Sequence, residues 1–262
     1  MFEALKKKGF EIACTSHAEA ILSKDFSAAA GEIEACLRRL DLPITEIIGS
    51  GGGEAKSTQR LRHALTERSW VKTTFEIKKT INGKQSESIS HEVDHVRSFE
   101  QGLVALEIEW NNKDPFFDRD LENFKRLHAD GAISVGVIVT RGSTLQDQMY
   151  DLVLRFARQR RVGSFDVLRK LGLDPTRRQV AAVMKRVERK KKPLPFDEAW
   201  TSHFVSDKFG AAATHWRKLM DRVSRGAGIH FKPRNAYLRK NLARVFKFEN
   251  ILVSPRAVAS NR

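Results

Sequence analysis

Residues 91–114 read HEVDHVRSFEQGLVALEIEWNNKD, and this stretch decides the fold because its two motifs require different backbone structures. Its first five residues fit H-E-x-x-H, in which two histidines on one face of a helix bind zinc. The stretch also contains Asp94 followed at a distance by Glu107-Ile108-Glu109, whose carboxylates could bind a divalent metal ion from two neighbouring strands. The secondary structure therefore decides between the two motifs.

The residues that precede this stretch predict strands. Apolar and polar side chains alternate along residues 71–81, which is typical of a strand with two different faces. Asn82-Gly83 then predicts a tight hairpin turn, with a return strand over residues 84–94. In a strand, His91 and His95 lie about 13 Å apart, and zinc–nitrogen bonds of about 2 Å cannot span that distance. The hairpin therefore disfavours a helical zinc site. The apolar face of the first strand is expected to carry Val71, Thr73, Phe75, Ile77 and Ile81.

LVALEIEW, residues 103–110, predicts a third strand in which Glu107 and Glu109 share a face. If this strand lies beside the hairpin, Asp94 joins them and three carboxylates converge. Such groups repel each other unless a cation compensates their charge, and Mg²⁺ prefers oxygen ligands of this kind. We therefore predict Asp94 and Glu107 as metal ligands, with the Ile108 carbonyl as a third. Glu109 would orient or deprotonate a water molecule for attack on phosphorus. Solvent-facing glutamates on an amphipathic strand are the alternative explanation.

The residues that follow predict a helix and a second strand. DRDLENFKRLHADG, residues 118–131, predicts a helix that points Leu121, Phe124 and Leu127 inward and stops at Gly131. ISVGVIVTRG, residues 133–142, is nearly continuously apolar and β-branched, as in a strand buried on both faces. Strand, helix and strand together predict a right-handed crossover between parallel neighbours. A further helix is expected over residues 144–161.

The N-terminal region predicts scaffold helices. Helical spacing of apolar residues indicates helices over residues 17–25 and 27–40, and a third follows a glycine run at residues 56–70. Cys14 and Cys36 lack metal-type spacing, so we expect two reduced, packed thiols in a cytoplasmic protein.

The charge is divided unevenly along the chain. The first 150 residues hold 20 basic and 23 acidic side chains, whereas the last 112 hold 27 and 9. A basic half of this kind indicates a polyanionic partner, nucleic acid rather than a membrane, because no apolar run approaches the roughly 20 residues that span a bilayer. A lysine-rich solvated surface is the alternative. Beyond Val162 the pattern indicates one or two helices, followed by a basic run at residues 190–192. We expect this run to be a solvated loop, with base-specific DNA binding as the alternative.

Asp94, Glu107-Ile108-Glu109, Trp110, Asn111 and the VGVIVTRG of residues 135–142 together resemble a known pattern. The chain resembles type II restriction endonucleases of the PD-(D/E)xK superfamily, near the BglII-like group, over roughly residues 51–142. The resemblance implies an α/β fold, with a restriction-endonuclease-like core of a central mixed β-sheet flanked by helices. A basic, mainly helical part would follow. We expect a catalytic core with N-terminal helices over residues 1–162 and a recognition part over residues 163–262, with one single domain as the alternative.

The same resemblance implies an activity and partners. It implies Mg²⁺-dependent, sequence-specific hydrolysis of double-stranded DNA that leaves 5′-phosphate and 3′-hydroxyl ends. It further implies a homodimer on palindromic sites and a cognate DNA methyltransferase in a restriction–modification system. Residues 208–226, KFGAAATHWRKLMDRVSRG, are similar to a segment of related endonucleases. The predicted DNA contacts are Thr214, His215, Arg217, Lys218, Arg177 and Arg178.

Two features depart from the family pattern. Glu109 stands where a lysine is usual, a replacement that BglII-like and BamHI-like enzymes tolerate by using Gln or Glu. Residues 228–253 do not match the hydrophobic closing strand of those relatives, so the recognition part of this protein is expected to differ. The alternative functions are a non-catalytic nucleic-acid-binding protein and, least favoured, a zinc metallopeptidase that uses HEVDH.

Overall fold

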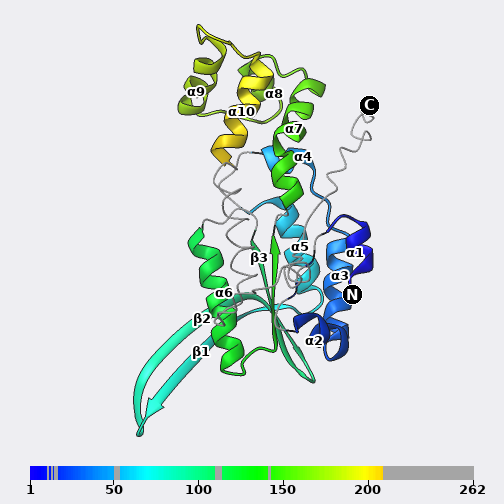
Figure 1. Ribbon diagram of the computed structural model, residues 1–262, viewed down its shortest axis with the longest axis vertical. Helices are drawn as coiled ribbons and strands as arrows, with labels where there is room; N and C mark the ends of the chain where they lie inside the picture. The colour runs from blue at the N-terminus through cyan, green and yellow to red at the C-terminus, as the bar shows by residue number, and fades with distance from the viewer. Residues whose placement is uncertain are drawn as a thin grey trace, which may run out of the picture.

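A mixed β-sheet forms the centre of the protein (Figure 1). The computed structural model describes residues 1–10, 12, 14, 17–49, 54–109, 114–140 and 143–208. In this part of the chain the sheet has the strand order β1-β2-β3-β4. The first two pairings are antiparallel and the third is parallel. The strands are β1 (Val71–Ile81), β2 (Lys84–Phe99), β3 (Gly102–Glu109) and β4 (Val135–Thr140).

The predicted parallel pairing of the two strands around a helix is confirmed. Helix α6 (Asp114–Ala129) joins β3 to β4, which run parallel in the sheet. The turn after α6 places Gly131 at a φ of 71°, a conformation that glycine adopts without strain. Phe124 packs so closely over β4 that a Cβ on Gly136 would lie 2.5 Å from its ring. The glycine therefore allows the crossover helix to approach the sheet.

Apolar side chains cover both faces of β3. One face carries Val104 and Leu106, which pack with β4 and the N-terminal helices in one hydrophobic cluster. The other face carries Ala105, which packs with Phe124 and Leu127 of α6 in a second cluster. Burial on both faces explains why this strand is rich in apolar residues. The helices on the first face are α1 (Glu3–Lys7), α2 (Ala18–Lys24), α3 (Ser27–Arg38) and α5 (Lys56–Thr66).

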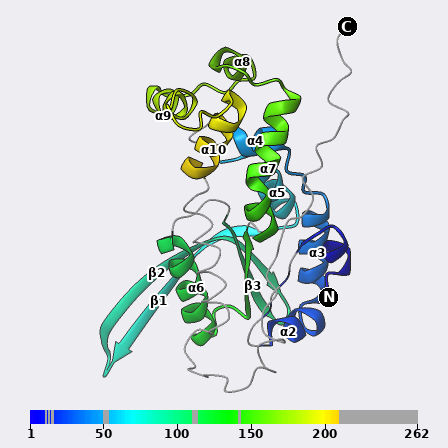
Figure 2. The same cartoon turned by 45° about the horizontal axis from the view of Figure 1, so that its top comes forward.

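The β1–β2 hairpin extends beyond the rest of the sheet (Figures 1 and 2). Asn82 and Gly83 form its turn with φ angles of 50° and 77°, as the sequence predicts. The apolar face of β1 is open to solvent at both ends, because Val71 is 54% exposed and Ile81 is 65% exposed. Ile81 lies at the tip of the hairpin, beyond a register shift at Lys79 and Thr80. Val71 lies next to a second shift, described below.

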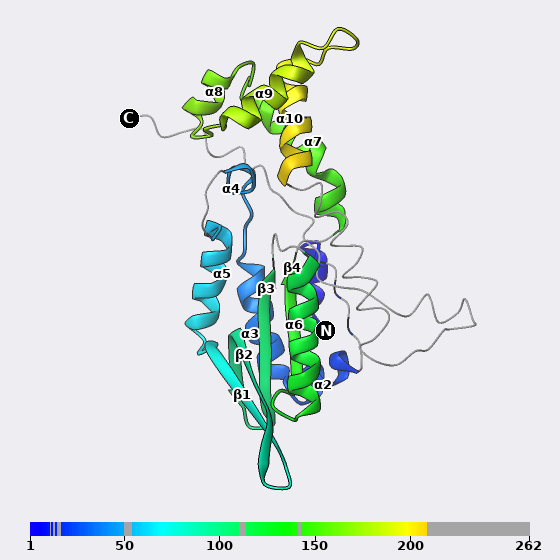
Figure 3. The same ribbon diagram turned by 90° about the vertical axis from the view of Figure 1, so that its left-hand side faces the viewer.

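A helical unit follows the sheet. It consists of α7 (Ser143–Gln159), α8 (Phe165–Lys170), α9 (Arg177–Val187) and α10 (Phe196–Lys208), with the short helix α4 (Ile44–Ile48) packed against it. These helices share a hydrophobic cluster that is distinct from the two at the sheet. Figure 3 shows the unit beyond the end of the sheet to which β3 points.

The sequence did not predict α1 or α4, each of which has only 5 residues. Such short helices carry too little periodic signal to be recognised. No helix of the described residues is long and apolar enough to cross a membrane. Cys14 is half-buried and Cys36 is buried, and both are free thiols.

Candidate active site

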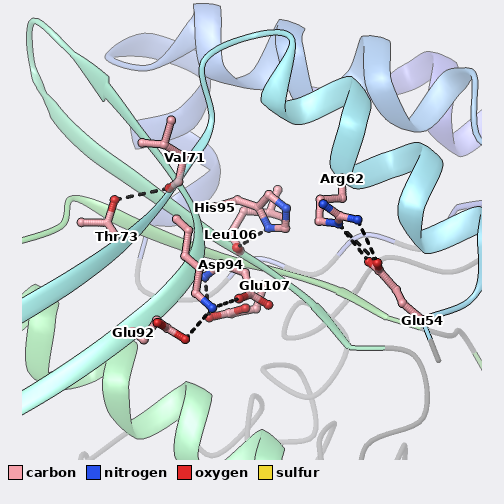
Figure 4. Close-up of polar contacts among 10 residues, drawn as sticks. Glu54, Arg62, Val71, Thr73, Glu92, Asp94, His95, Leu106 and Glu107 are labelled. Carbon is pink, nitrogen blue, oxygen red and sulfur yellow. Dashed lines mark hydrogen bonds and ion pairs between the residues drawn. The ribbon is translucent and has the colours of Figure 1, made fainter. Parts of the chain in front are cut away.

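A β-bulge in β2 determines how Asp94 is placed. Val71 pairs with Val96 and Thr73 with Val93, so Asp94 and its neighbour together lie opposite one residue of β1. A bulge of this kind interrupts the ladder and redirects side chains, and it is common next to active sites. The Asp94 backbone N–H donates a hydrogen bond of 3.3 Å to Glu107 Oε1 on β3, which brings these two residues together (Figure 4).

The strand conformation overturns the zinc-protease hypothesis. His91 and His95 both lie on β2, and His91 pairs with Phe75 of β1. His95 is 3% exposed, and its Nδ1 lies 3.3 Å from the Leu106 carbonyl oxygen. Burial lowers the pKa of His95, so its ring is neutral at pH 7. The H-E-x-x-H pattern therefore lacks the helix that would bring its two imidazoles to one metal ion.

Two carboxyl groups of β3 are buried beneath α6. Glu107 is 7% exposed and Glu109 is 6% exposed, on the same face as Ala105. Burial, followed by the charges of Asp94 and Asp120, raises the pKa of Glu107 to about 8. Burial, followed by the hydrogen bond and the charge of Asp120, raises the pKa of Glu109 to about 9. Both groups therefore hold a proton at neutral pH until a positive charge displaces it.

Asp120 of α6 is a member of this cluster that the sequence did not predict. Its side chain is 2% exposed, and Arg119 Nε lies 3.1 Å from its Oδ1 atom. Asp120 lies on the same helical stripe as Phe124 and Leu127. An acidic residue on an otherwise apolar stripe is the signal that could have identified it.

Thr140 fixes the backbone at the end of β3. It is the last residue of β4, it is 2% exposed, and its Oγ1 donates a hydrogen bond of 2.6 Å to the Glu109 carbonyl oxygen. Glu109 also pairs with Thr140 in the parallel ladder. The crossover therefore fixes the main chain that carries Glu107 and Glu109.

The Asp94 carboxylate points toward solvent. It is 55% exposed, and its Oδ1 lies 3.8 Å from Lys72 Nζ. No three His, Cys, Asp or Glu side chains of the described residues already have the arrangement of a metal site. The donor chemistry nevertheless fits a hard divalent cation. Asp94 and Glu107 offer carboxylate oxygens, the ligands that Mg²⁺ prefers, and a cation would offset the burial and the repulsion that together raise the pKa of Glu107. A rotation of the exposed Asp94 side chain would bring its carboxylate beside that of Glu107, so that both could bind one cation.

An open groove runs past Asp94 on the side of α5. Its volume is about 450 Å³. Arg62 Nη2 lies 3.1 Å from Glu54 Oε2 within the groove (Figure 4). Lys72 Nζ lies 2.6 Å from Glu92 Oε1. Solvent and ligands can therefore reach the Asp94 carboxylate from this side. The residues that line the groove are Glu54, Arg62, Thr66, Trp70, Val71, Lys72, Asp94 and His95.

The predicted DNA contacts fall in two parts of the chain. Arg177 and Arg178 lie at the start of α9 and are exposed. The remaining four, which are Thr214, His215, Arg217 and Lys218, lie outside the described residues, as do Trp110, Asn111 and the atypical segment 228–253.

Acidic groups on adjacent strands of a mixed sheet, with a parallel crossover behind them, are consistent with a restriction-endonuclease-like core. A family model described as restriction endonuclease BglII/BglIII matches residues 10–231. Because this match covers most of the chain, the protein belongs to that family. It is therefore a type II site-specific deoxyribonuclease, and enzymes of this family generally use a divalent metal ion. A comparison with curated proteins finds no match.

The match extends well beyond the stretch that carries the resemblance in the sequence. It begins near the N-terminal helices and includes the whole helical unit from α7 to α10. The unit is therefore part of the matched family region.

Proposed function

We propose that the protein hydrolyses phosphodiester bonds of double-stranded DNA at specific sequences, with Mg²⁺ as its cofactor. The products would be 5′-phosphate and 3′-hydroxyl ends. The observation that carries this proposal is the hydrogen bond from Asp94 N–H to Glu107 Oε1 across β2 and β3. It joins the main chain of Asp94 to the carboxyl group of Glu107, and these are the two residues that the family pattern assigns to the metal. Glu109 follows on the same face of β3.

Asp94 and Glu107 would bind the cation through their carboxylate oxygens, with the Ile108 carbonyl as a further ligand. Glu107 contributes a fixed oxygen because β3 is paired on both sides. Asp94 contributes a movable oxygen because its side chain is exposed. Bound Mg²⁺ supplies positive charge that attracts a phosphate oxygen and lowers the pKa of a nearby water molecule.

Glu109 would act as the general base. It accepts a proton from the attacking water while the water oxygen forms a bond to phosphorus and the bond from phosphorus to the 3′ oxygen breaks. The leaving 3′ oxygen takes a proton from solvent. Because Glu109 holds a proton at neutral pH in the metal-free protein, it can act only after that proton has left. The bond from Thr140 to the Glu109 carbonyl oxygen keeps its backbone in place during this step.

The basic half of the chain would bind the DNA. Arg177 and Arg178 are exposed on α9, and the predicted contacts at residues 214–218 belong to the same basic half. Lysine and arginine contacts to phosphates supply most of the sequence-independent affinity.

Cleavage of both strands needs two sites, so we further propose a homodimer whose two-fold axis matches that of a palindromic DNA site. A cognate DNA methyltransferase would protect the same sequence in the host. Residues 1–162 would form the catalytic core and residues 163–262 the recognition part.

Incubation of the purified protein with bacteriophage DNA and Mg²⁺ tests the proposal. We expect discrete fragments with Mg²⁺, no fragments with a chelator, and loss of cutting in Asp94→Ala and Glu107→Ala. Glu76→Gln is the matched control, because Glu76 is an exposed carboxylate of β1 that pairs with Lys78 away from the site. Sequencing of the fragment ends would give the cut position and the chemistry of the ends.

Two results would contradict the proposal. Cutting that persists in Glu107→Ala would remove Glu107 from the site. DNA binding by the wild-type protein without cleavage under any divalent ion would support the non-catalytic alternative instead.

A further inference from the structure

Helix α9 presents an outward face that the catalytic site does not use. Residues 177–192, which comprise α9 and the loop after it, hold eight Lys and Arg side chains and one Glu, a formal charge of +7. Arg178, Ala181 and Lys185 are exposed and follow helical spacing, so they share one face of the helix. The opposite face buries Val183 in the core of the helical unit.

The cations of this face are not neutralised by the protein. Arg177, Arg178 and Lys185 form no ion pair with another described residue, whereas Arg60, on α5, pairs with Glu46 at 2.8 Å. A helix face with several unpaired cations has a strong positive potential, which attracts a polyanion. Because the protein belongs to a family of DNA-cleaving enzymes, the polyanion that fits this face is duplex DNA.

The helix is held rigidly at its start. Thr176 forms a capping box with Gln179, in which the Gln179 N–H donates to Thr176 Oγ1 at 3.3 Å and the Thr176 N–H donates to Gln179 Oε1 at 2.9 Å. The turn between α8 and α9 contains Gly172 at a φ of 76°. The connection of residues 171–176 is longer than the three- or four-residue turn of a helix-turn-helix motif. A helix that is fixed at its start can nevertheless present one constant face to the major groove.

The dimensions and side chains of α9 suit that groove. A helix of 11 residues is about 16 Å long, and the major groove of B-DNA, about 12 Å wide, admits an α-helix. The small side chain of Ala181 lies between Arg178 and Lys185, so the backbone could approach base edges closely at its centre. Arginine can bind guanine through two hydrogen bonds, and alanine can contact the methyl group of thymine.

Helix α9 also lies at the correct end of the molecule. In Figures 1 and 3 it lies beyond the carboxyl end of β3, where Glu107 and Glu109 are located, and opposite the tip of the β1–β2 hairpin. A duplex that extends from the carboxylate cluster toward the helical unit would reach the end of the molecule that carries α9.

We propose that α9 enters the major groove of the substrate DNA and that Arg178, Ala181 and Lys185 contact base edges and so determine sequence specificity. This inference rests on the proposed function, which places the cut at the carboxylate cluster. It can nevertheless be tested by DNA binding without cleavage. The exposed basic face of α9 would therefore bind duplex DNA.

The test is a binding selection from duplexes with a randomised central segment, in the presence of Ca²⁺ to compensate the carboxylates. The wild type is compared with Arg178→Lys, which keeps the charge but loses the planar guanidinium, and with Lys185→Ala. Arg39→Lys is the matched control, since Arg39 is an exposed arginine after α3. We expect Arg178→Lys to weaken binding of the wild-type sequence about tenfold to a hundredfold and to relax the preference at adjacent base positions. The control should select the wild-type sequence.

Other outcomes would overturn the inference. If Arg178→Lys and Lys185→Ala select the wild-type sequence with unchanged affinity, α9 does not contact DNA. If they weaken binding to all duplexes equally, α9 contacts only the backbone. A wild type that enriches no sequence would also contradict a base-contacting helix. The two proposals can fail separately. If the wild type prefers one sequence, the α9 variants lose that preference and the wild type cuts no DNA with Mg²⁺, the catalytic proposal fails and the role of α9 in recognition is supported.

Discussion

The carboxylate cluster at β3 and the basic face of α9 have opposite physical characters. The cluster is acidic and buried, and burial, together with the neighbouring carboxyl groups, raises the pKa values of Glu107 and Glu109 to about 8 and about 9. The face of α9 is basic and exposed, and its charges are surrounded by solvent. Charges interact strongly where water is excluded and weakly where water and salt screen them. Single substitutions should therefore have large, pH-dependent effects at the cluster and smaller, salt-dependent effects on α9.

Glu107→Ala should have the largest effect of any substitution considered. Loss of a metal ligand removes several kcal/mol of transition-state stabilisation, so cleavage should fall about 1000-fold or more. DNA binding should persist, because the phosphate contacts come from the basic half of the chain. Cleavage rates and electrophoretic mobility shifts of the same preparation would measure the two properties. Equal losses of cleavage and of DNA binding would contradict the assignment of catalysis to the carboxylate cluster and of binding to the basic half of the chain.

The pH dependence of stability should be the next largest effect. In the folded, metal-free protein Glu107 and Glu109 keep protons that the unfolded chain loses near 4.5. Their contribution to stability is therefore present below about pH 4.5 and is lost as the pH rises through about 8 and 9. In the presence of a chelator, the unfolding temperature should fall as the pH rises from about 4.5 to about 9. Glu107→Gln should reduce this fall, because a glutamine side chain cannot ionise. Thermal unfolding followed by circular dichroism would measure it, and an unchanged slope in Glu107→Gln would contradict the assignment.

Asp120→Asn should have a moderate effect that sharpens the comparison. The substitution removes a charge that raises the pKa of Glu109, so the rise of cleavage rate with pH should move to lower pH. Binding of DNA should not change, because Asp120 is buried under α6. The pH profile of single-turnover cleavage would report the shift. An unchanged profile would mean that Asp120 serves only the structure.

The double variant Arg178→Ala/Lys185→Ala should change how DNA binding depends on ionic strength, while the chemistry at the carboxylate cluster stays as in the wild type. Loss of two contacts should reduce the slope of log affinity against log salt concentration by about 2 if both touch phosphates, and by less if they contact bases. Lys24→Ala/Arg39→Ala removes two exposed charges from other helices and is the matched control. Binding titrations at several salt concentrations would measure the slopes. Equal slopes in the two variants would contradict a specific role for α9.

The sheet could be predicted from the sequence because its signals are local. Asn82-Gly83 fixes a hairpin, and the alternation in residues 71–81 and 103–110 indicates strands. The parallel crossover followed from a helix between two apolar strands, and the structure confirms it. The exposure of Val71 and Ile81 could not be predicted, because alternation shows which residues share a face but not how far the hairpin extends beyond the rest of the sheet.

The site was less accessible to sequence reasoning. The hydrogen bond between Asp94 and Glu107 depends on a bulge, and a bulge adds one residue without a clear composition signal. Asp120 was missed because its burial depends on how α6 packs over β3. The basic half of the chain was evident from charge alone, but the exposed face of α9 needed the positions of its neighbours.

The most direct test is the release of protons when Mg²⁺ is added to the DNA-free protein. Calorimetric titrations at pH 7 in two buffers of different ionisation enthalpy would count these protons. If Asp94 and Glu107 bind the ion, the wild type should release protons on saturation, because the pKa of Glu107 is about 8 without metal. Glu107→Gln should bind Mg²⁺ more weakly and release fewer. Saturable binding without proton release, or identical titrations of the wild type and the variant, would contradict a metal site at these residues.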